Sequence, residues 1–385
     1  MHIATGTSAL NIIRCIRAQG RSVALEWFSE VEQPIPDAYL PDAKPPSAPQ
    51  GREHADLLCP LFEETLEQAS FPFDRVVANR RIDLSRIDGS EMLAHKAPLE
   101  LGIFDLRLKT YRDSLRTRLL RRDLPRQALV GAGKHTCFSC PELVVLQLAQ
   151  QLSVPLLAQV IMELAGFYAL APSQDFETVY DIPPITTLAR IETLARRARM
   201  MRGRSVLRAA LHIACERSAS PAETILAIML QSPIQDGGYG IERPLLNPCI
   251  TAPRGTRSHV SQQHFYPDIY LQGCYTDIEY ESTEFHLDPI TTNWQAGELK
   301  NWQAGFAQKA ANERRRAREL QSLGVHVIPV TSYDMVSRAK LDNVAWSLAR
   351  QMERLGQIDA ASYMRTLDTS DYRNARTALL ENLKK

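Results

Sequence analysis

The stretch that decides the fold of this chain runs from Tyr266 to His286 and reads YPDIYLQGCYTDIEYESTEFH. Gly273 and Cys274 can form a two-residue hairpin turn between two strand-like runs. In that hairpin Gln272 opposes Tyr275, and every other cross-strand pair follows from this register. The sequence therefore predicts an antiparallel hairpin over this stretch.

The hairpin register brings three carboxylates together. It places Asp268 opposite Glu279, and Glu281 shares their face because side chains alternate along a strand. Carboxylates that lie so near one another raise each other's pKa unless a cation neutralises them. Hard divalent ions prefer oxygen ligands of this kind. An acidic face on an exposed hairpin is the alternative, although Asp and Glu are poor strand formers. We therefore expect a Mg²⁺ (or Mn²⁺) site on Asp268, Glu279 and Glu281.

Two further residues are candidates for the same catalytic site. Glu223 opens a helix after Ser220, and the spacing Ser220-x-x-Glu223 is also that of a capping box, so Glu223 can serve either role. His286 can act as a general acid or base because its unperturbed pKa is about 6.5. A surface histidine that follows a strand is the alternative for His286.

A long charged helix is expected from about Gly305 to Leu323, and it supplies the opposite charge. Arg314 and Arg318 share a face because they are four residues apart. A helix of this kind beside the hairpin could hold a phosphate backbone, whereas an exposed helix of mixed charge is the alternative. The residues that we expect to contact nucleic acid are Lys309, Arg314, Arg315 and Arg318.

The whole chain has the composition of a globular protein. Its 385 residues suggest about two domains, and a net charge of +1 gives no global evidence for nucleic acid. The amino terminus lacks the basic start of a signal peptide, and no run of about 18 apolar residues predicts a membrane span. Seven scattered cysteines are typical of reduced thiols. We therefore expect a cytoplasmic protein without a membrane partner.

The pattern of the chain changes near residue 216. Residues 1–215 are expected to be mainly helical, with a winged-helix-like arrangement as one form, and to carry arginine-rich stretches at 107–126 and 196–208 that are either solvated surfaces or phosphate contacts. From residue 216 to 385 the order is helix, strands, helix and the strand Val325–Val330, with helices at the end. That order predicts an α/β layer fold.

The carboxy-terminal residues resemble a known family, the PD-(D/E)XK nuclease superfamily, and most closely the branch of very-short-patch-repair endonucleases. The resemblance covers about residues 216–335, and the segment from Cys140 to Tyr168 is more weakly similar to antitoxin-like regions fused to such nucleases. It is carried by Pro267-Asp268, Glu279-Tyr-Glu281-Ser with His286, Asn312-Glu-Arg-Arg315, Leu320-x-x-Leu323-Gly324 and Val327-Ile-Pro-Val-Thr331.

The resemblance implies a restriction-endonuclease-like mixed sheet flanked by helices. It also implies a Mg²⁺-dependent endonuclease that cleaves DNA, with RNA not excluded, in defence against foreign DNA or in repair. Asp268 and Glu279 would be metal ligands. Glu281 replaces the usual motif lysine, which leaves the role of that lysine to His286, to Lys309 or to no residue. An antitoxin-like or regulatory DNA-binding protein with an inactive nuclease-fold domain is the alternative function.

Overall fold

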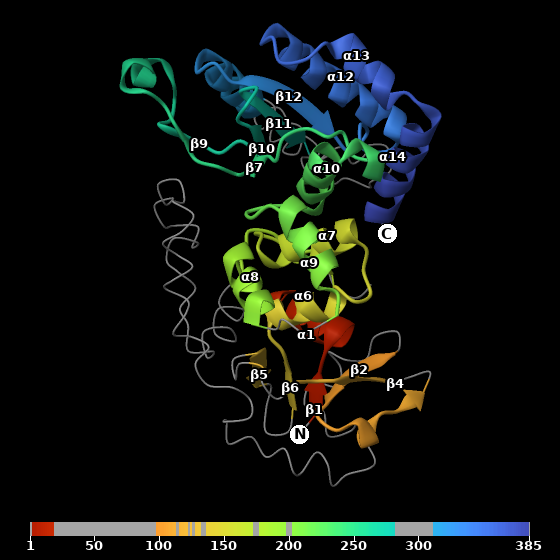
Figure 1. Cartoon of the computed structure of the whole chain (residues 1–385). Helices are drawn as coiled ribbons and strands as arrows, with labels where there is room; N and C mark the ends of the chain where they lie inside the picture. The colour runs from red at the N-terminus through yellow and green to blue at the C-terminus, as the bar shows by residue number, and fades with distance from the viewer. Residues whose placement is uncertain are drawn as a thin grey trace, which may run out of the picture. The chain divides into compact units, whose positions relative to one another are not determined.

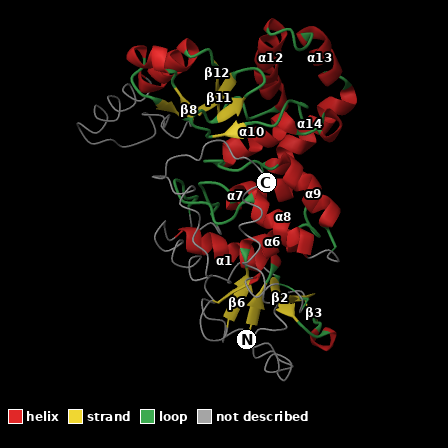
Figure 2. Cartoon of the chain, turned by 60° about the vertical axis from the view of Figure 1, so that its left-hand side comes forward, coloured by secondary structure: helices red, strands yellow, loops and turns green. Residues whose placement is uncertain are grey.

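The chain divides into two compact units, residues 1–221 and residues 222–385 (Figure 1). The computed structural model describes residues 2–18, 98–112, 115–121, 124, 128–131, 136–171, 177–197, 202–281 and 311–384. Both units combine helices with β-strands, so the chain is of the mixed α/β class (Figure 2). No helix in the described part of the chain is long and apolar enough to cross a lipid bilayer.

The first unit contains a six-stranded mixed sheet with the order β3-β4-β2-β1-β6-β5. The central strand β1 pairs in parallel with β6 and antiparallel with β2, and β2 continues in parallel with β4. The strands are β1 (His2–Ala4), β2 (Leu99–Ile103), β3 (Tyr111–Arg112), β4 (Leu115–Leu119), β5 (Leu129–Gly131) and β6 (Thr136–Ser139).

Helices complete the first unit and supply most of its buried apolar side chains. The 3-10 turn η4 (Leu106–Leu108) lies between β2 and β3, and the α-helices are α1 (Gly6–Ala18), α6 (Pro141–Leu148), α7 (Val154–Leu164), α8 (Leu188–Arg197) and α9 (Arg204–Ile213). Helices α6 and α7 each have a proline in the first turn, where the missing N–H costs no hydrogen bond.

The described part of residues 1–215 contains these helices and, in addition, a six-stranded sheet that the expectation of a mainly helical region did not include. Strand β4 shows why the expectation was incomplete. Its sequence Leu115-Arg-Thr-Arg-Leu119 places both arginines on one face of the strand; on the other face Leu115 is buried, Thr117 is half-buried and Leu119 is exposed. A strand with three consecutive polar residues and one buried leucine carries little periodic signal, which is why its arginine-rich sequence did not predict a strand.

The second unit is built around a four-stranded sheet with the order β12-β11-β10-β7. Strand β10 pairs antiparallel with both β7 and β11, and β12 runs parallel to β11. A parallel neighbour requires a crossover, and the described part of that crossover is a helix over residues 311–322. The strands are β7 (Leu245–Leu246), β10 (Ile269–Leu271), β11 (Thr276–Glu281) and β12 (His326–Thr331).

Helices and a small hairpin surround this sheet. Helix α10 (Pro221–Gln231) and the 3-10 turn η6 (Ile234–Asp236) precede it, and α12 (Arg338–Arg354), α13 (Ala360–Leu367) and α14 (Ser370–Leu383) follow it. Strands β8 (Ile250–Thr251) and β9 (His264–Phe265) form a separate two-stranded sheet with the 3-10 helix η7 (Arg254–His259) between them.

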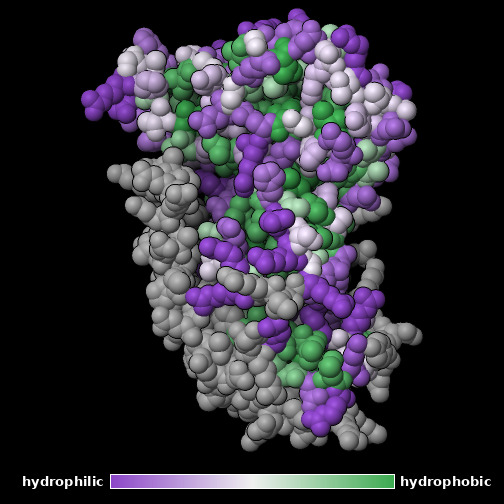
Figure 3. Space-filling view, viewed as in Figure 1, coloured by the Kyte–Doolittle hydropathy of each residue, from purple (hydrophilic) through white to green (hydrophobic). Residues whose placement is uncertain are grey.

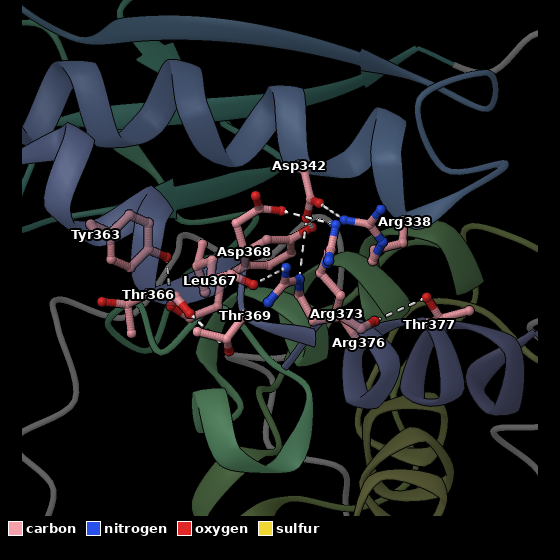
Figure 4. Close-up of polar contacts among 11 residues, drawn as sticks. Arg338, Asp342, Tyr363, Thr366, Leu367, Asp368, Thr369, Arg373, Arg376 and Thr377 are labelled. Atoms are coloured by element: carbon pink, nitrogen blue, oxygen red, sulfur yellow. Dashed lines mark hydrogen bonds and ion pairs between the residues drawn. The ribbon is translucent and has the colours of Figure 1, made fainter. Parts of the chain in front are cut away.

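The three last helices are joined by a buried polar network around Asp342 (Figure 4). The Asp342 carboxylate accepts a hydrogen bond from the Tyr239 hydroxyl at 2.8 Å and one from Arg376 Nε at 3.2 Å, and it pairs with Arg338. Arg376 is fully buried and donates a second hydrogen bond to the Leu367 carbonyl at 2.6 Å. One aspartate therefore ties α12 to α14 and to the loop that follows η6.

Candidate active site

The hairpin of β10 and β11 has the register expected from its turn. Ile269 pairs with Ile278 and Tyr270 with Asp277, so the register continues to Asp268 opposite Glu279. The Asp268 side chain also crosses to the neighbouring strand, where its Oδ2 accepts a hydrogen bond from the Tyr280 backbone N–H at 2.9 Å. The register prediction is confirmed.

Asp277 belongs to the same acidic cluster, although it was not among the predicted site residues. It lies two residues before Glu279 on β11, so both side chains emerge on one face. Asp277 is fully buried, and neither of its carboxylate oxygens makes a hydrogen bond of normal geometry within the described residues. The signal for it was the alternation Asp277-Ile-Glu279-Tyr-Glu281, of which only the last two acids were used. Glu281 is exposed at the end of β11.

Glu223 reaches the cluster from helix α10 and is held there by Asn247. Glu223 is buried, and its Oε2 accepts a hydrogen bond from Asn247 Nδ2 at 2.9 Å. The Asn247 backbone N–H donates to the Asp268 carbonyl at 3.1 Å, so this residue fixes both acids. Asn247 has a φ of 47°, a left-handed conformation in which asparagine is better tolerated than most residues.

Among the described residues, Arg316 is a cation that pairs directly with the cluster. It lies on the helix of residues 311–322, and its Nη2 is 2.9 Å from Glu279 Oε1. The same nitrogen donates to the Tyr266 carbonyl. Arg316 therefore holds the crossover helix against the start of β10 and neutralises part of the charge on Glu279.

One arginine does not balance the acids, and their pKa values reflect this. Burial, together with repulsion from Glu279, raises the pKa of Asp268 to about 7. Burial and the adjacent Asp277 carboxyl raise the pKa of Glu279 to about 9, with a smaller contribution from Glu223. Burial also raises the pKa of Asp277 to about 6, although a hydrogen bond with Glu279 opposes the rise. A protonated Glu279 can donate that hydrogen bond to Asp277.

The remaining predicted residues divide into two groups. His286 and Lys309 lie outside the described residues. Arg314, Arg315 and Arg318 are exposed on the helix that carries Arg316, and Arg315 Nη2 lies 3.5 Å from Asn312 Oδ1. The predicted basic residues therefore share an element with the one that contacts the acidic cluster.

The donor set of the cluster fits a hard divalent cation in type and charge. Its ligand atoms are carboxylate oxygens, and the buried Asp277 oxygens lack partners of normal geometry among the described residues. Burial, together with the neighbouring carboxyls, raises the pKa values of Asp268 and Glu279. In the part of the chain that the structure describes, no three Asp, Glu, His or Cys side chains are already arranged to hold an ion. Binding would therefore require reorientation of the carboxylates that face Arg316 and one another.

No family model, no curated protein and no solved structure matches this chain. The resemblance to PD-(D/E)XK nucleases consequently stays a prediction that rests on the motif residues. The site itself is defined by its geometry, with four carboxylates from three elements and one arginine from a fourth.

Proposed function

We propose that this protein is a metal-dependent endonuclease that hydrolyses phosphodiester bonds of DNA. The observation that carries the proposal is the excess of buried and half-buried carboxylates over cations among the described residues at the β10–β11 hairpin, with Asp277 left without a normal hydrogen bond there. Perturbed acids with a specific charge partner are typical of functional sites. The mixed sheet with its crossover helix agrees with what the resemblance implies.

The roles that we propose for the residues follow from their contacts. Asp268, Asp277 and Glu279 would hold Mg²⁺ or Mn²⁺, with Glu223 nearby and Glu281 at the exposed edge. The ion would polarise a phosphate oxygen and acidify a bound water. Arg316 carries a permanent positive charge, so it can provide electrostatic stabilisation where the usual lysine is missing but cannot act as a base.

A specific observation favours a second candidate function. Arg316 already pairs with Glu279 at 2.9 Å, and among the described residues no group of three ligands is preformed. An arginine that neutralises the acids permanently would leave a DNA-binding domain without nuclease activity. This is the antitoxin-like or regulatory alternative.

The test is cleavage of supercoiled plasmid and of single-stranded DNA by the full chain with Mg²⁺, with Mn²⁺ and with EDTA. We expect cleavage that requires the ion and falls at least about a hundredfold in Asp268→Asn, because a metal ion supplies several kcal/mol of transition-state stabilisation. The matched control is Asp371→Asn, since Asp371 is exposed on α14. Cleavage that persists in EDTA or in Asp268→Asn would contradict the site. DNA binding by the wild type without any cleavage would favour the second candidate.

The exposed arginines of the crossover helix give a separate prediction. Replacing Arg314, Arg315 and Arg318 with Ala should weaken DNA binding similarly for all sequences and flatten its salt dependence, by about one slope unit for each lost phosphate contact. Thermal stability should change little because exposed charges contribute little to it. Fluorescence anisotropy at several salt concentrations measures the slope, and an unchanged slope with unchanged affinity would exclude this helix from the DNA contact.

A further inference from the structure

A basic arm extends from the second unit between β7 and β10. It comprises residues 250–265, in which β8 and β9 pair through Ile250–Phe265 and Thr251–His264 and η7 forms the tip. Figure 1 shows the arm beside the helix of residues 311–322, and Figure 2 shows the same neighbours in a second view. Neither motif nor resemblance pointed to this element.

The tip of the arm is positively charged and exposed. Residues 244–267 contain no Asp or Glu, whereas η7 carries Arg254, Arg257 and His259, all of them exposed. Residues three apart in a 3-10 helix lie above one another, so Arg254 and Arg257 share a face. Arg257 Nε donates to the Ala252 carbonyl at 3.3 Å, which positions the guanidinium. Figure 3 shows hydrophilic side chains at this end of the unit.

The base of the arm is fixed to the same helix that reaches the acidic site. Phe265 and Ala252 are buried against Leu320. Ser261 donates from its backbone N–H at 3.1 Å and from its hydroxyl at 2.9 Å to the Glu319 carboxylate. The arm is therefore a packed element, and the Ser261–Glu319 hydrogen bonds anchor it to this helix.

The basic arm and the acidic site contact neighbouring turns on one face of the helix of residues 311–322. Leu320 packs against the arm, and Arg316, one turn earlier on that face, contacts Glu279 and the Tyr266 carbonyl. The chain itself runs from Phe265 at the end of the arm to Asp268 in three residues. A fixed basic element next to carboxylates suits a polyanion whose backbone continues past the site.

We propose that the basic arm binds the sugar-phosphate backbone of the nucleic acid at a distance from the scissile phosphodiester bond. Arg254 and Arg257 contact phosphates that flank the acidic site, and the contact is independent of base sequence. This inference rests on the proposed function, because it places the substrate of that site along the arm. It adds a second contact to the one expected from the crossover helix.

The experiment compares Arg254→Ala/Arg257→Ala with the wild type in the full chain. Binding of a labelled DNA duplex is measured by anisotropy in EDTA between 50 and 200 mM salt, and cleavage is measured in Mg²⁺ with the same preparations. We expect weaker binding and a salt slope reduced by about two units, one for each phosphate. Arg254→Lys/Arg257→Lys should keep most of the slope because it keeps the charge. The control Arg350→Ala/Arg373→Ala removes two exposed arginines from α12 and α14 and should bind like the wild type.

The outcomes separate this inference from the proposed function. If Arg254→Ala/Arg257→Ala binds DNA with the affinity and the salt dependence of the wild type, the arm does not contact DNA. This conclusion holds even if the wild type cleaves DNA. A reduced slope in that variant supports the arm even where no preparation cleaves, in which case only the nuclease activity fails. A wild type that binds no DNA at 50 mM salt would overturn both. Unchanged circular dichroism of the Ala variant shows that a loss of binding is not a loss of fold.

Discussion

Asp342→Ala is expected to lower the free energy of unfolding of the second unit by about 3–5 kcal/mol, the usual cost of leaving a buried charge without its partner. The buried charge is Arg376, whose Nε lies 3.2 Å from the Asp342 carboxylate and whose side chain has no exposed surface. The substitution also removes the acceptor of the Tyr239 hydroxyl. For a unit of this size the loss corresponds to roughly 6–20 °C in melting temperature.

Two comparisons make this prediction specific to the buried network of Figure 4. Arg350→Ala breaks an exposed ion pair with Glu353 on the same helix and should cost under about 1 kcal/mol. Asp342→Ala combined with Arg376→Met should cost less than the sum of the single changes, because no unpaired charge stays buried. Urea unfolding of the four variants measures these differences. Equal effects of Arg350→Ala and Asp342→Ala would mean that the network contributes no more than a surface pair.

The register of the β10–β11 hairpin could be predicted because local rules determine it. The Gly273–Cys274 turn leaves only one pairing, and a strand period of two then sets which residues face one another. The expected strand Val325–Val330 agrees with β12 (His326–Thr331) to within one residue at each end. It could be predicted because Gly324 marks its start and its sequence is rich in β-branched residues. The type of turn and the alternation of side chains along a strand depend only on residues near one another in the chain. Both can therefore be predicted from a single sequence.

Other features depend on contacts between distant residues and could not be read in the same way. The chain from His264 to Leu271 forms two strands, β9 and β10, that are separated at Pro267, which lacks the N–H that a central strand requires. Its first part pairs with β8 in the arm and its second with β11. The choice of partners is made by burial of Phe265 against Leu320, more than 50 residues away. Asn247, which bridges Glu223 and Asp268, is likewise a long-range feature.

Stability of the second unit in the absence of metal is expected to fall as the pH rises from 5 to 9. Burial and mutual repulsion raise the pKa of Asp268 to about 7 and that of Glu279 to about 9, above their usual values near 4. A carboxyl with a raised pKa keeps its proton in the folded state at a pH where the unfolded chain has lost it. Its contribution is therefore complete below about pH 4 and is lost as the pH rises through the folded pKa.

The expected size of this effect is large enough to measure by urea unfolding in EDTA. Each such carboxyl changes stability by at most about 1.4 kcal/mol per pH unit, so Glu279 alone has an upper limit of roughly 4 kcal/mol between pH 5 and pH 8. Glu279→Gln should flatten the profile and leave the unit more stable than the wild type at pH 8 in EDTA. The matched control Glu381→Gln, an exposed residue of α14, should follow the wild type.

If these carboxylates are metal ligands, a divalent ion should oppose the loss of stability that the protein shows in EDTA as the pH rises. Mg²⁺ or Mn²⁺ binds the deprotonated carboxylates of the folded state, so its stabilising effect should grow with pH and should be absent in Glu279→Gln. A site that Arg316 neutralises permanently predicts instead a flat profile and no response to metal. A wild-type profile that is level in EDTA and matches that of Glu279→Gln would show that the acids are already compensated. The same measurement therefore decides between a cluster that needs a cation and one that already contains its own.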